Sequence, residues 1–248
     1  RALSLQSDDQ AHALRPKIPV ANQFSRPALR LPLWRQARGE PPMKRVALED
    51  YLKLRDGGEL IERDRHGEKV VRRPDGTMLK LFRRKRLVSS ALFYPYAQRF
   101  ADNCERLRIL GIPCPTAISV IRVPAIERDL VHYHPLPGRT LRQLRPELDD
   151  DAARNLRRDL GEFFARLHRL GVYFRSLHLG NVVLTPEGRL GLIDVADLAV
   201  RRGPLGASAR RRNLRHLARY AEDHAWLHAD DAYALAYAEG LRDPSPQG

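Results

Sequence analysis

An asparagine and an aspartate stand at the two ends of one short stretch of the chain. Asn181 opens the apolar run NVVL, Asp194 follows the apolar run LGLI, and a polar turn lies between the runs. Two short strands joined by a turn predict a hairpin, which brings both residues to one edge. Amide and carboxylate oxygens there suit a hard cation. The alternative without chemistry is that Asp194 caps a turn and Asn181 closes a loop.

A lysine inside an apolar run also needs a chemical explanation. In MLKLF, Lys80 is flanked by Leu79 and Leu81, and in a strand it shares its face with Met78 and Phe82. Burying an unpaired ammonium group would be costly. We therefore expect an anionic partner for Lys80, the alternative being an exposed lysine on an edge strand.

The elements that must position these residues change in character along the chain. Between residues 43 and 135, β-type runs and turn signals predict strands and one amphipathic helix. The expected segments are a three-stranded meander at 58–82, a helix at 89–110 stopped by Gly111 and Pro113, and strands at 116–123 and 128–136. This part is predicted to be a small β-rich lobe.

The second half of the chain reads as mostly helical. Apolar residues at three- and four-residue steps predict a helix at 150–170, and helices are also expected at 210–228 and 230–241. Residues 136–248 are therefore assigned to a second lobe. The Pro- and Arg-rich residues 1–42 show neither helical nor strand periodicity, and we expect a disordered or non-native extension there.

Composition limits the partners. The 248-residue chain carries a formal net charge of +14, which favours anionic partners. No RNP motif, zinc-finger spacing or basic zipper is present, so no dedicated nucleic-acid binding is expected. Cys104 and Cys114 have no metal-site spacing. The absence of a long apolar run and of a signal-peptide pattern leads us to expect a soluble cytoplasmic protein, with peripheral association at the inner membrane as an option.

The order of elements resembles the protein-kinase-like fold, an α+β fold of two lobes. In that superfamily a loop of the type His-Gly-Asp-Leu-His-Pro-Gly-Asn follows a helix, and Ile-Asp-Phe comes about 13 residues after the Asn. Here the corresponding stretches are FRSLHLGN and Ile193-Asp194-Val195, and Asp194 follows Asn181 by 13 residues. Within the superfamily, the stretches GEKVVRRPDGTMLKLFRRKR (67–86) and RRRNLRHLARY (210–220) look most similar to the bacterial lipopolysaccharide core kinases, including heptose and Kdo kinases and InaA-like, toluene-tolerance proteins. The resemblance covers residues 58 to about 228.

The resemblance implies ATP and Mg²⁺ as cofactors and assigns roles to the residues above. Asp194 would chelate the metal that bridges the nucleotide phosphates, and Asn181 would hold metal from the catalytic loop. Lys80 would meet a nucleotide phosphate and a carboxylate from the helix. Glu105 is the first candidate for that carboxylate, although it lies nearer the helix end than the family pattern places it; Asn103 and Asp102 are the alternatives.

The nucleotide-binding loop and strand are less well marked. A single glycine, Gly67, stands where kinases usually carry two or three, so phosphate contact by this turn competes with a plain turn. Residues 130–133, including Val131 and Tyr133, are expected by their order in the chain to be the hinge strand whose backbone meets the adenine.

Ser176 departs from the family pattern. It stands where the resembled loop carries the Asp that orients the acceptor hydroxyl and accepts its proton, and a Ser hydroxyl is a poor base. Phe174 also replaces the usual His. His178 could contact the γ-phosphate or act as a substitute base, and Asp197 could be recruited for the same task; the alternatives are a structural hydrogen bond for His178 and a surface position for Asp197.

Three functions are therefore compatible with the sequence. The first is an ATP- and Mg²⁺-dependent phosphotransferase that acts on a sugar hydroxyl of an anionic glycolipid, such as the lipopolysaccharide core, or a related small molecule. The second is a pseudokinase that binds nucleotide or a protein partner without transfer, because Ser176 replaces the catalytic Asp. The third is an enzyme with this fold and different chemistry.

Overall fold

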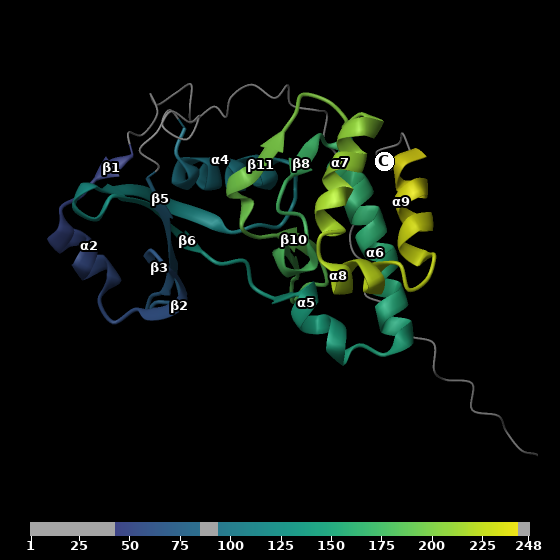
Figure 1. Ribbon diagram of the computed structural model, residues 1–248, viewed down its shortest axis with the longest axis horizontal. Helices are drawn as coiled ribbons and strands as arrows, with labels where there is room; N and C mark the ends of the chain where they lie inside the picture. Colours follow the sequence, from purple (N-terminus) through teal and green to yellow (C-terminus); the bar gives the residue numbers. More distant parts are fainter. Residues whose placement is uncertain (1–42, 85–93, 243–248) are drawn as a thin grey trace, which may run out of the picture.

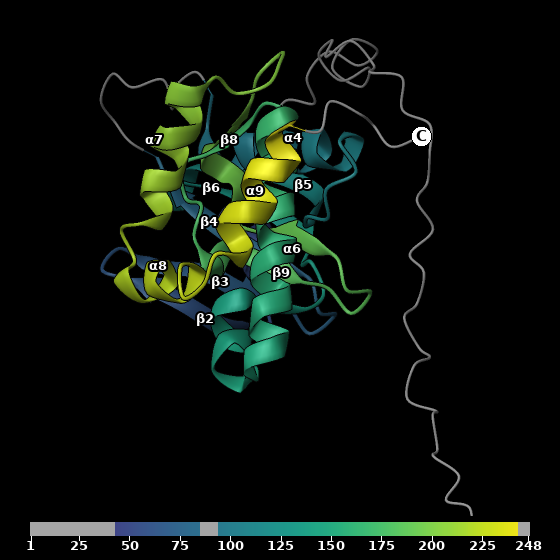
Figure 2. The ribbon, with the colours of Figure 1, turned by 90° about the vertical axis from the view of Figure 1, so that its right-hand side faces the viewer.

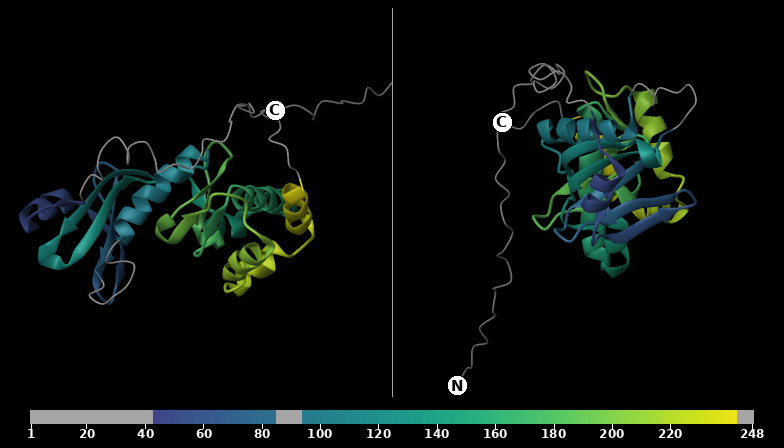
Figure 3. Two further views of the ribbon diagram at one scale, coloured as in Figure 1. Left: turned by 90° about the horizontal axis from the view of Figure 1, so that it is seen from above. Right: turned by 90° about the vertical axis from the view of Figure 1, so that its left-hand side faces the viewer.

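The structure is a computed structural model that describes residues 43–84 and 94–242. A β-rich region and a helical region lie side by side, with α4 beside the sheet (Figures 1 and 3). This arrangement confirms the predicted two-lobed, kinase-like α+β fold. The predicted extension at residues 1–42 lies outside the described residues.

The β-rich region is built on one twisted sheet in the order β1-β5-β6-β4-β3-β2. Its strands are β1 (Lys44–Arg45), β2 (Glu59–Asp64), β3 (Gly67–Arg72), β4 (Met78–Arg83), β5 (Thr116–Val123) and β6 (Arg128–His134). The meander predicted for residues 58–82 is β2-β3-β4, paired antiparallel. Strand β6 lies between β4 and β5, which places Lys80 opposite Val131 in the interior of the sheet.

Two helices accompany this sheet, α2 (Leu48–Arg55) and α4 (Tyr96–Ile109). The helix predicted from residue 89 begins at Tyr96, directly after Pro95, because proline cannot supply the N–H of an interior helical residue. Phe100, Cys104 and Leu107 form the buried side of α4. They join a continuous apolar cluster that extends from β6 into the helical region, so the two regions share one core.

The helical region contains α5 (Leu141–Leu144), α6 (Asp150–Arg169), α7 (Ala207–Leu217), α8 (Ala221–Leu227) and α9 (Ala232–Arg242). Helices α6 and α9 pack side by side (Figure 2), and Gly161 of α6 allows the close approach because a Cβ there would meet Tyr233 O at 2.5 Å. Within residues 43–84 and 94–242, no helix has the length and apolarity needed to cross a membrane.

Short strands connect the helices and carry the loops of interest. They are β7 (Arg139–Thr140), β8 (Val172–Phe174), β9 (Val182–Leu184), β10 (Leu190–Leu192) and β11 (Leu198–Val200). The hairpin predicted between Asn181 and Asp194 is formed by β9 and β10. Strand β8 pairs with β11, so the segment before Asn181 and the segment after Asp194 lie next to each other.

Candidate phosphoryl-transfer site

Lys80 and Asp194 form an ion pair where the sheet meets the β9–β10 hairpin. Lys80 Nζ lies 2.6 Å from Asp194 Oδ1. The lysine side chain is only 10% exposed, whereas the aspartate side chain is 43% exposed. The buried ammonium group therefore has the anionic partner that its position in an apolar strand requires. The exposed part of Asp194 faces solvent and remains accessible to a ligand.

The backbone at Asp194 is held in an unusual conformation. Its φ of 56° and ψ of 43° lie in the left-handed region, which costs a non-glycine residue roughly 1–3 kcal/mol and persists only where surrounding contacts enforce it. Asn103 of α4 supplies such contacts, since its Nδ2 donates to Val195 O at 2.7 Å and to Leu198 O at 2.8 Å. Buried Asn103 thus fixes the turn that follows Asp194.

Asn181 is positioned by the loop before it and the strand after it. Its Nδ2 donates to Ser176 O at 2.8 Å, and its backbone carbonyl accepts from Ile193 N at 3.0 Å. The side-chain Oδ1 of Asn181 has no partner among the described residues. Asn181 therefore presents an amide oxygen next to the chain segment that carries Asp194.

These two oxygen donors fit a magnesium ion. Mg²⁺ takes hard oxygen ligands and commonly binds through one or two protein groups, with phosphates and water completing its shell. The described residues contain no group of three or more His, Cys, Asp or Glu side chains arranged for a metal.

Ser176 and Asp197 are brought together by the β8–β11 pairing. Ser176 Oγ donates to Asp197 Oδ2 at 2.6 Å. Asp197 Oδ1 is buried without a hydrogen-bond partner among the described residues. Burial raises the pKa of the Asp197 carboxyl above its ordinary value, and the negative charge of Asp194 adds to this, whereas the Ser176 hydrogen bond lowers it. A carboxylate therefore lies one hydrogen bond from the loop position where an Asp was expected.

His178 has a structural role in the same loop. Its Nδ1 accepts a hydrogen bond from Gly180 N at 3.1 Å, and its ring packs 4.6 Å from the ring of Tyr220. Burial lowers the pKa of His178, and the nearby charge of Arg142 acts in the same direction. These contacts agree with the structural alternative for His178, and its contact with the γ-phosphate or role as a base stays a prediction.

Two buried polar residues that the sequence analysis missed hold the loop in place. Asn213 of α7 accepts from Phe174 N at 3.2 Å and donates to Phe174 O. Asp223 of α8 accepts from Leu179 N at 3.2 Å and from Arg142 Nη2 at 2.5 Å. Asn213 lies four residues before buried Leu217 and so shares the apolar side of the predicted helix. A single amide on that side could have indicated a buried polar residue.

The structure changes the interpretation of the predicted adenine-contacting strand. Val131 and Tyr133 lie on β6, which is paired with β4 on one side and β5 on the other. Their backbone groups are therefore engaged in the sheet, which weighs against a backbone contact with adenine at these two residues, and that contact stays a prediction.

Gly67 occupies the turn between β2 and β3. Its φ of 115° lies in the region that favours glycine, and a Cβ there would meet nothing within 4 Å. The turn requires Gly67 for its own geometry, and phosphate contact by this turn stays a prediction.

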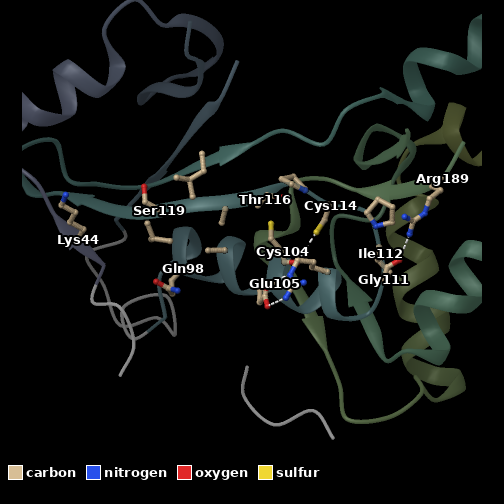
Figure 4. A pocket seen from close by; sticks show the side chains of 17 residues that line it. Lys44, Gln98, Cys104, Glu105, Gly111, Ile112, Cys114, Thr116, Ser119 and Arg189 are labelled. Carbon is tan, nitrogen blue, oxygen red and sulfur yellow. Dashed lines mark hydrogen bonds and ion pairs between the residues drawn. The ribbon is translucent and has the colours of Figure 1, made fainter. Parts of the chain in front are cut away.

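The predicted pairing of Lys80 with Glu105 is not found among the described contacts. Glu105 pairs with Arg108 at 2.7 Å and lines a cavity of about 700 Å³ between α4 and β5 (Figure 4). The side chains of Asn103 and Cys104 are buried in the core, and the helical rotation therefore directs Glu105 away from them. Cys114, in the same cavity, donates to Cys104 O at 3.2 Å, and both cysteines are free thiols.

Comparison with known proteins adds a family match. The model of the lipopolysaccharide kinase (Kdo/WaaP) family matches residues 55–237, well over half of the 248 residues. The matched range includes the sheet that carries Lys80, the hairpin with Asn181 and Asp194, and the Ser176–Asp197 pair. No curated protein matches the chain.

Proposed function

The chain belongs to the lipopolysaccharide kinase (Kdo/WaaP) family, and from that premise we propose that it transfers the γ-phosphoryl group of ATP to a sugar hydroxyl. The proposed acceptor is an anionic glycolipid such as the lipopolysaccharide core, or a related small molecule, met at the inner membrane surface. The hydrogen bond between Ser176 and Asp197 is the observation that carries the proposal. It supplies a carboxylate to a catalytic loop whose own Asp is replaced.

Nucleotide binding is assigned to the region between the proposed lobes, residues 43–135 and 136–248. When bound, Mg²⁺ would neutralise charge on the transferred phosphoryl group. Asp194 and Asn181 Oδ1 would hold the metal. Lys80, which is buried beside Asp194, would direct its ammonium group toward the nucleotide phosphates. Phosphoryl transfer depends mainly on positioning and on such charge neutralisation, so these residues account for most of the required machinery.

Asp197 is the proposed general base. Its carboxylate would take the proton that the acceptor hydroxyl loses as the new phosphate ester bond forms and the bond to ADP breaks. Ser176 Oγ would orient the hydroxyl and could relay the proton, since it already donates to Asp197 Oδ2. The raised pKa of Asp197 makes it a stronger base than an exposed aspartate.

A pseudokinase is the second candidate. Ser176 in place of the catalytic Asp favours it, because the hydroxyl carries no charge with which to accept a proton. In that case the protein would bind nucleotide, or a protein partner, through the same region without transferring phosphate. Both candidates require the Lys80–Asp194 pair for nucleotide binding, and they differ at Asp197.

Transfer of label from γ-labelled ATP to purified lipopolysaccharide separates the two candidates. The proposal predicts labelled lipopolysaccharide with the wild type and loss of the label with Asp194→Ala and with Asp197→Asn. Ser176→Ala should retain part of the activity, because Asp197 remains. Mg²⁺-dependent ATP binding without labelling of core sugars or related sugar acceptors would instead support the pseudokinase.

A further inference from the structure

A strongly basic pocket lies beside the catalytic loop on the helical region. This open pocket of about 850 Å³ is lined by residues of β8, β11 and α7 and of the segments that follow them. Figure 1 shows where these three elements lie. His216 also lines the pocket, whose positive charge comes from five arginines: Arg175, Arg201, Arg212, Arg215 and Arg219. We refer to it as the arginine pocket.

The arginines of the arginine pocket form no ion pairs among the described residues, although the charge of Asp197 acts on Arg175 and His216. No carboxylate lines the pocket. Some other arginines of the described chain are paired with carboxylates, for example Arg139 with Glu147 and Arg108 with Glu105. Guanidinium groups that line the same pocket repel one another unless a bound anion offsets their charge. The arrangement thus favours an anionic ligand.

The pocket adjoins the proposed base through the alternation of side chains along β8. Val172 and Phe174 are buried, so Tyr173 and Arg175 point to the other face, where both line the pocket. Arg175 directly precedes Ser176 in the chain. Its charge also acts on Asp197, and the charge of Asp197 acts on His216. An anion in the pocket would therefore lie next to the proposed site of transfer.

The shape of the lining argues against single-stranded nucleic acid. Such ligands need an open aromatic face on which bases stack. Among the described residues that line the pocket, Tyr173 and His216 are the aromatic side chains. The ring of Tyr173 is covered, because the Arg201 guanidinium lies 5.4 Å from its centre and the His216 ring packs edge-on against it at 6.4 Å. The pocket presents guanidinium groups without a stacking platform.

We propose that the arginine pocket binds a phosphate group carried by the acceptor and so places the acceptor hydroxyl near Ser176 and Asp197. Planar guanidinium groups bind phosphate oxygens in pairs, which gives direction as well as affinity. That the phosphate belongs to the acceptor rests on the proposed function, whereas the binding of an anion rests on the pocket alone. A phosphate on a sugar and a phosphate in a lipid headgroup share this chemistry.

The test is binding of inorganic phosphate to the full chain by calorimetry. The double variant Arg212→Ala/Arg215→Ala should weaken phosphate binding by at least about tenfold, since it removes charge-assisted hydrogen bonds. The matched control is Arg211→Ala, which removes an exposed arginine from the same helix but from outside the pocket. Its affinity for phosphate should stay within about twofold of wild type.

A second arm identifies the source of the phosphate. Sedimentation with phosphatidylcholine vesicles, with and without phosphatidylglycerol, is compared for the same variants. Loss of both phosphate and anionic-vesicle binding in the double variant means that headgroups are accepted. Loss of phosphate binding alone points to a phosphate on the acceptor. Unchanged binding of both overturns the proposal.

Lys80→Ala separates this site from the nucleotide site. The proposal predicts that the variant keeps phosphate binding. If Lys80→Ala loses phosphate binding and the double variant keeps it, the anion binds at the nucleotide site and the proposal falls. If the double variant loses phosphate binding but the wild type never labels an acceptor, the anion site is supported and the proposed transfer function is contradicted.

Discussion

At the scale of single residues, the chemistry depends on two aspartates three positions apart. Asp194 directly precedes the 3₁₀ turn Val195–Asp197, and Asp197 ends it. One carboxylate pairs with Lys80 while the other accepts from Ser176. Burial raises the pKa of Asp197, and the charge of Asp194 adds to this. The spacing in DVAD thus couples the proposed metal ligand to the proposed base.

The first prediction concerns Asp197→Asn. This change keeps the size of the side chain and removes its ability to accept a proton, and a general base contributes about 10²–10⁴-fold to such rates. We expect kcat for labelling of lipopolysaccharide to fall at least about 100-fold, with little change in KM for ATP. Full kcat in Asp197→Asn would contradict the assignment.

The pH dependence of the same reaction is a second prediction. Because burial raises the pKa of Asp197, the base becomes protonated at a higher pH than an ordinary aspartate would. Transfer should therefore decline, as pH falls, at a higher pH than an exposed aspartate would give. The acidic limb should be absent from the residual activity of Asp197→Asn, and an unchanged limb in that variant would assign it to another group.

At the scale of elements, the phase of α4 decides which of its residues can act. The buried positions Phe100, Cys104 and Leu107 could be found from apolar spacing, and they imply that Asn103 points inward and Glu105 outward. Sequence reasoning favoured Glu105 because a carboxylate was sought. Asn103 bonds to carbonyl groups 92 and 95 residues away, a pairing that no local pattern reveals.

The third prediction tests this role of α4. Asn103→Ala would leave the carbonyl groups of Val195 and Leu198 without their donor in a buried environment, at a cost of about 1–3 kcal/mol. We expect a lower free energy of unfolding in urea and a lower kcat. Glu105→Ala, two residues along the same helix, should change stability by less than about 0.5 kcal/mol, because it breaks only a surface pair. Equal effects of the two changes would contradict the assigned role.

The fourth prediction concerns the contact between α6 and α7 behind the catalytic loop. Burial lowers the pKa of His168 to about 4, and its Nε2 lies 3.3 Å from Asn213 Oδ1. The unfolded chain takes up a proton at His168 near pH 6.5, whereas the folded chain does so only near pH 4, so stability is lost as pH falls between these values. The loss is on the order of 3 kcal/mol.

Urea unfolding at several pH values checks this prediction. The wild type should lose stability steeply between about pH 6.5 and 4, and His168→Gln, which removes the titrating group, should show a shallower slope over the same range. Identical slopes would mean that His168 does not titrate as its burial implies.

At the scale of the whole molecule, the order of strands and helices could be predicted because periodicity and turn residues are local signals. The meander, the β9–β10 hairpin and the helical second half were found in this way. The central position of β6 in the sheet could not be predicted, because it depends on which strands pair although they are far apart in the sequence. Its position engages the backbone of Val131 in pairing with strands on both sides.

The shared core gives the whole molecule one further property. A single apolar cluster joins α4 and β6 to α6 and the short strands, so the Lys80 side and the Asp194 side of the site are held together by packing. A ligand that contacts both sides should therefore stabilise the entire fold and not one region alone. Thermal unfolding is a suitable readout of nucleotide binding for this reason.

The most direct test of the account is thermal unfolding with ATP, with and without Mg²⁺, for wild type, Asp194→Ala and Asp197→Asn. A ligand at a hundredfold excess over its Kd stabilises the native state by about 2.7 kcal/mol. We predict a Mg²⁺-dependent rise in Tm for wild type and Asp197→Asn, and its loss in Asp194→Ala. No rise with the wild type at millimolar Mg²⁺ and ATP would contradict the proposed phosphotransferase.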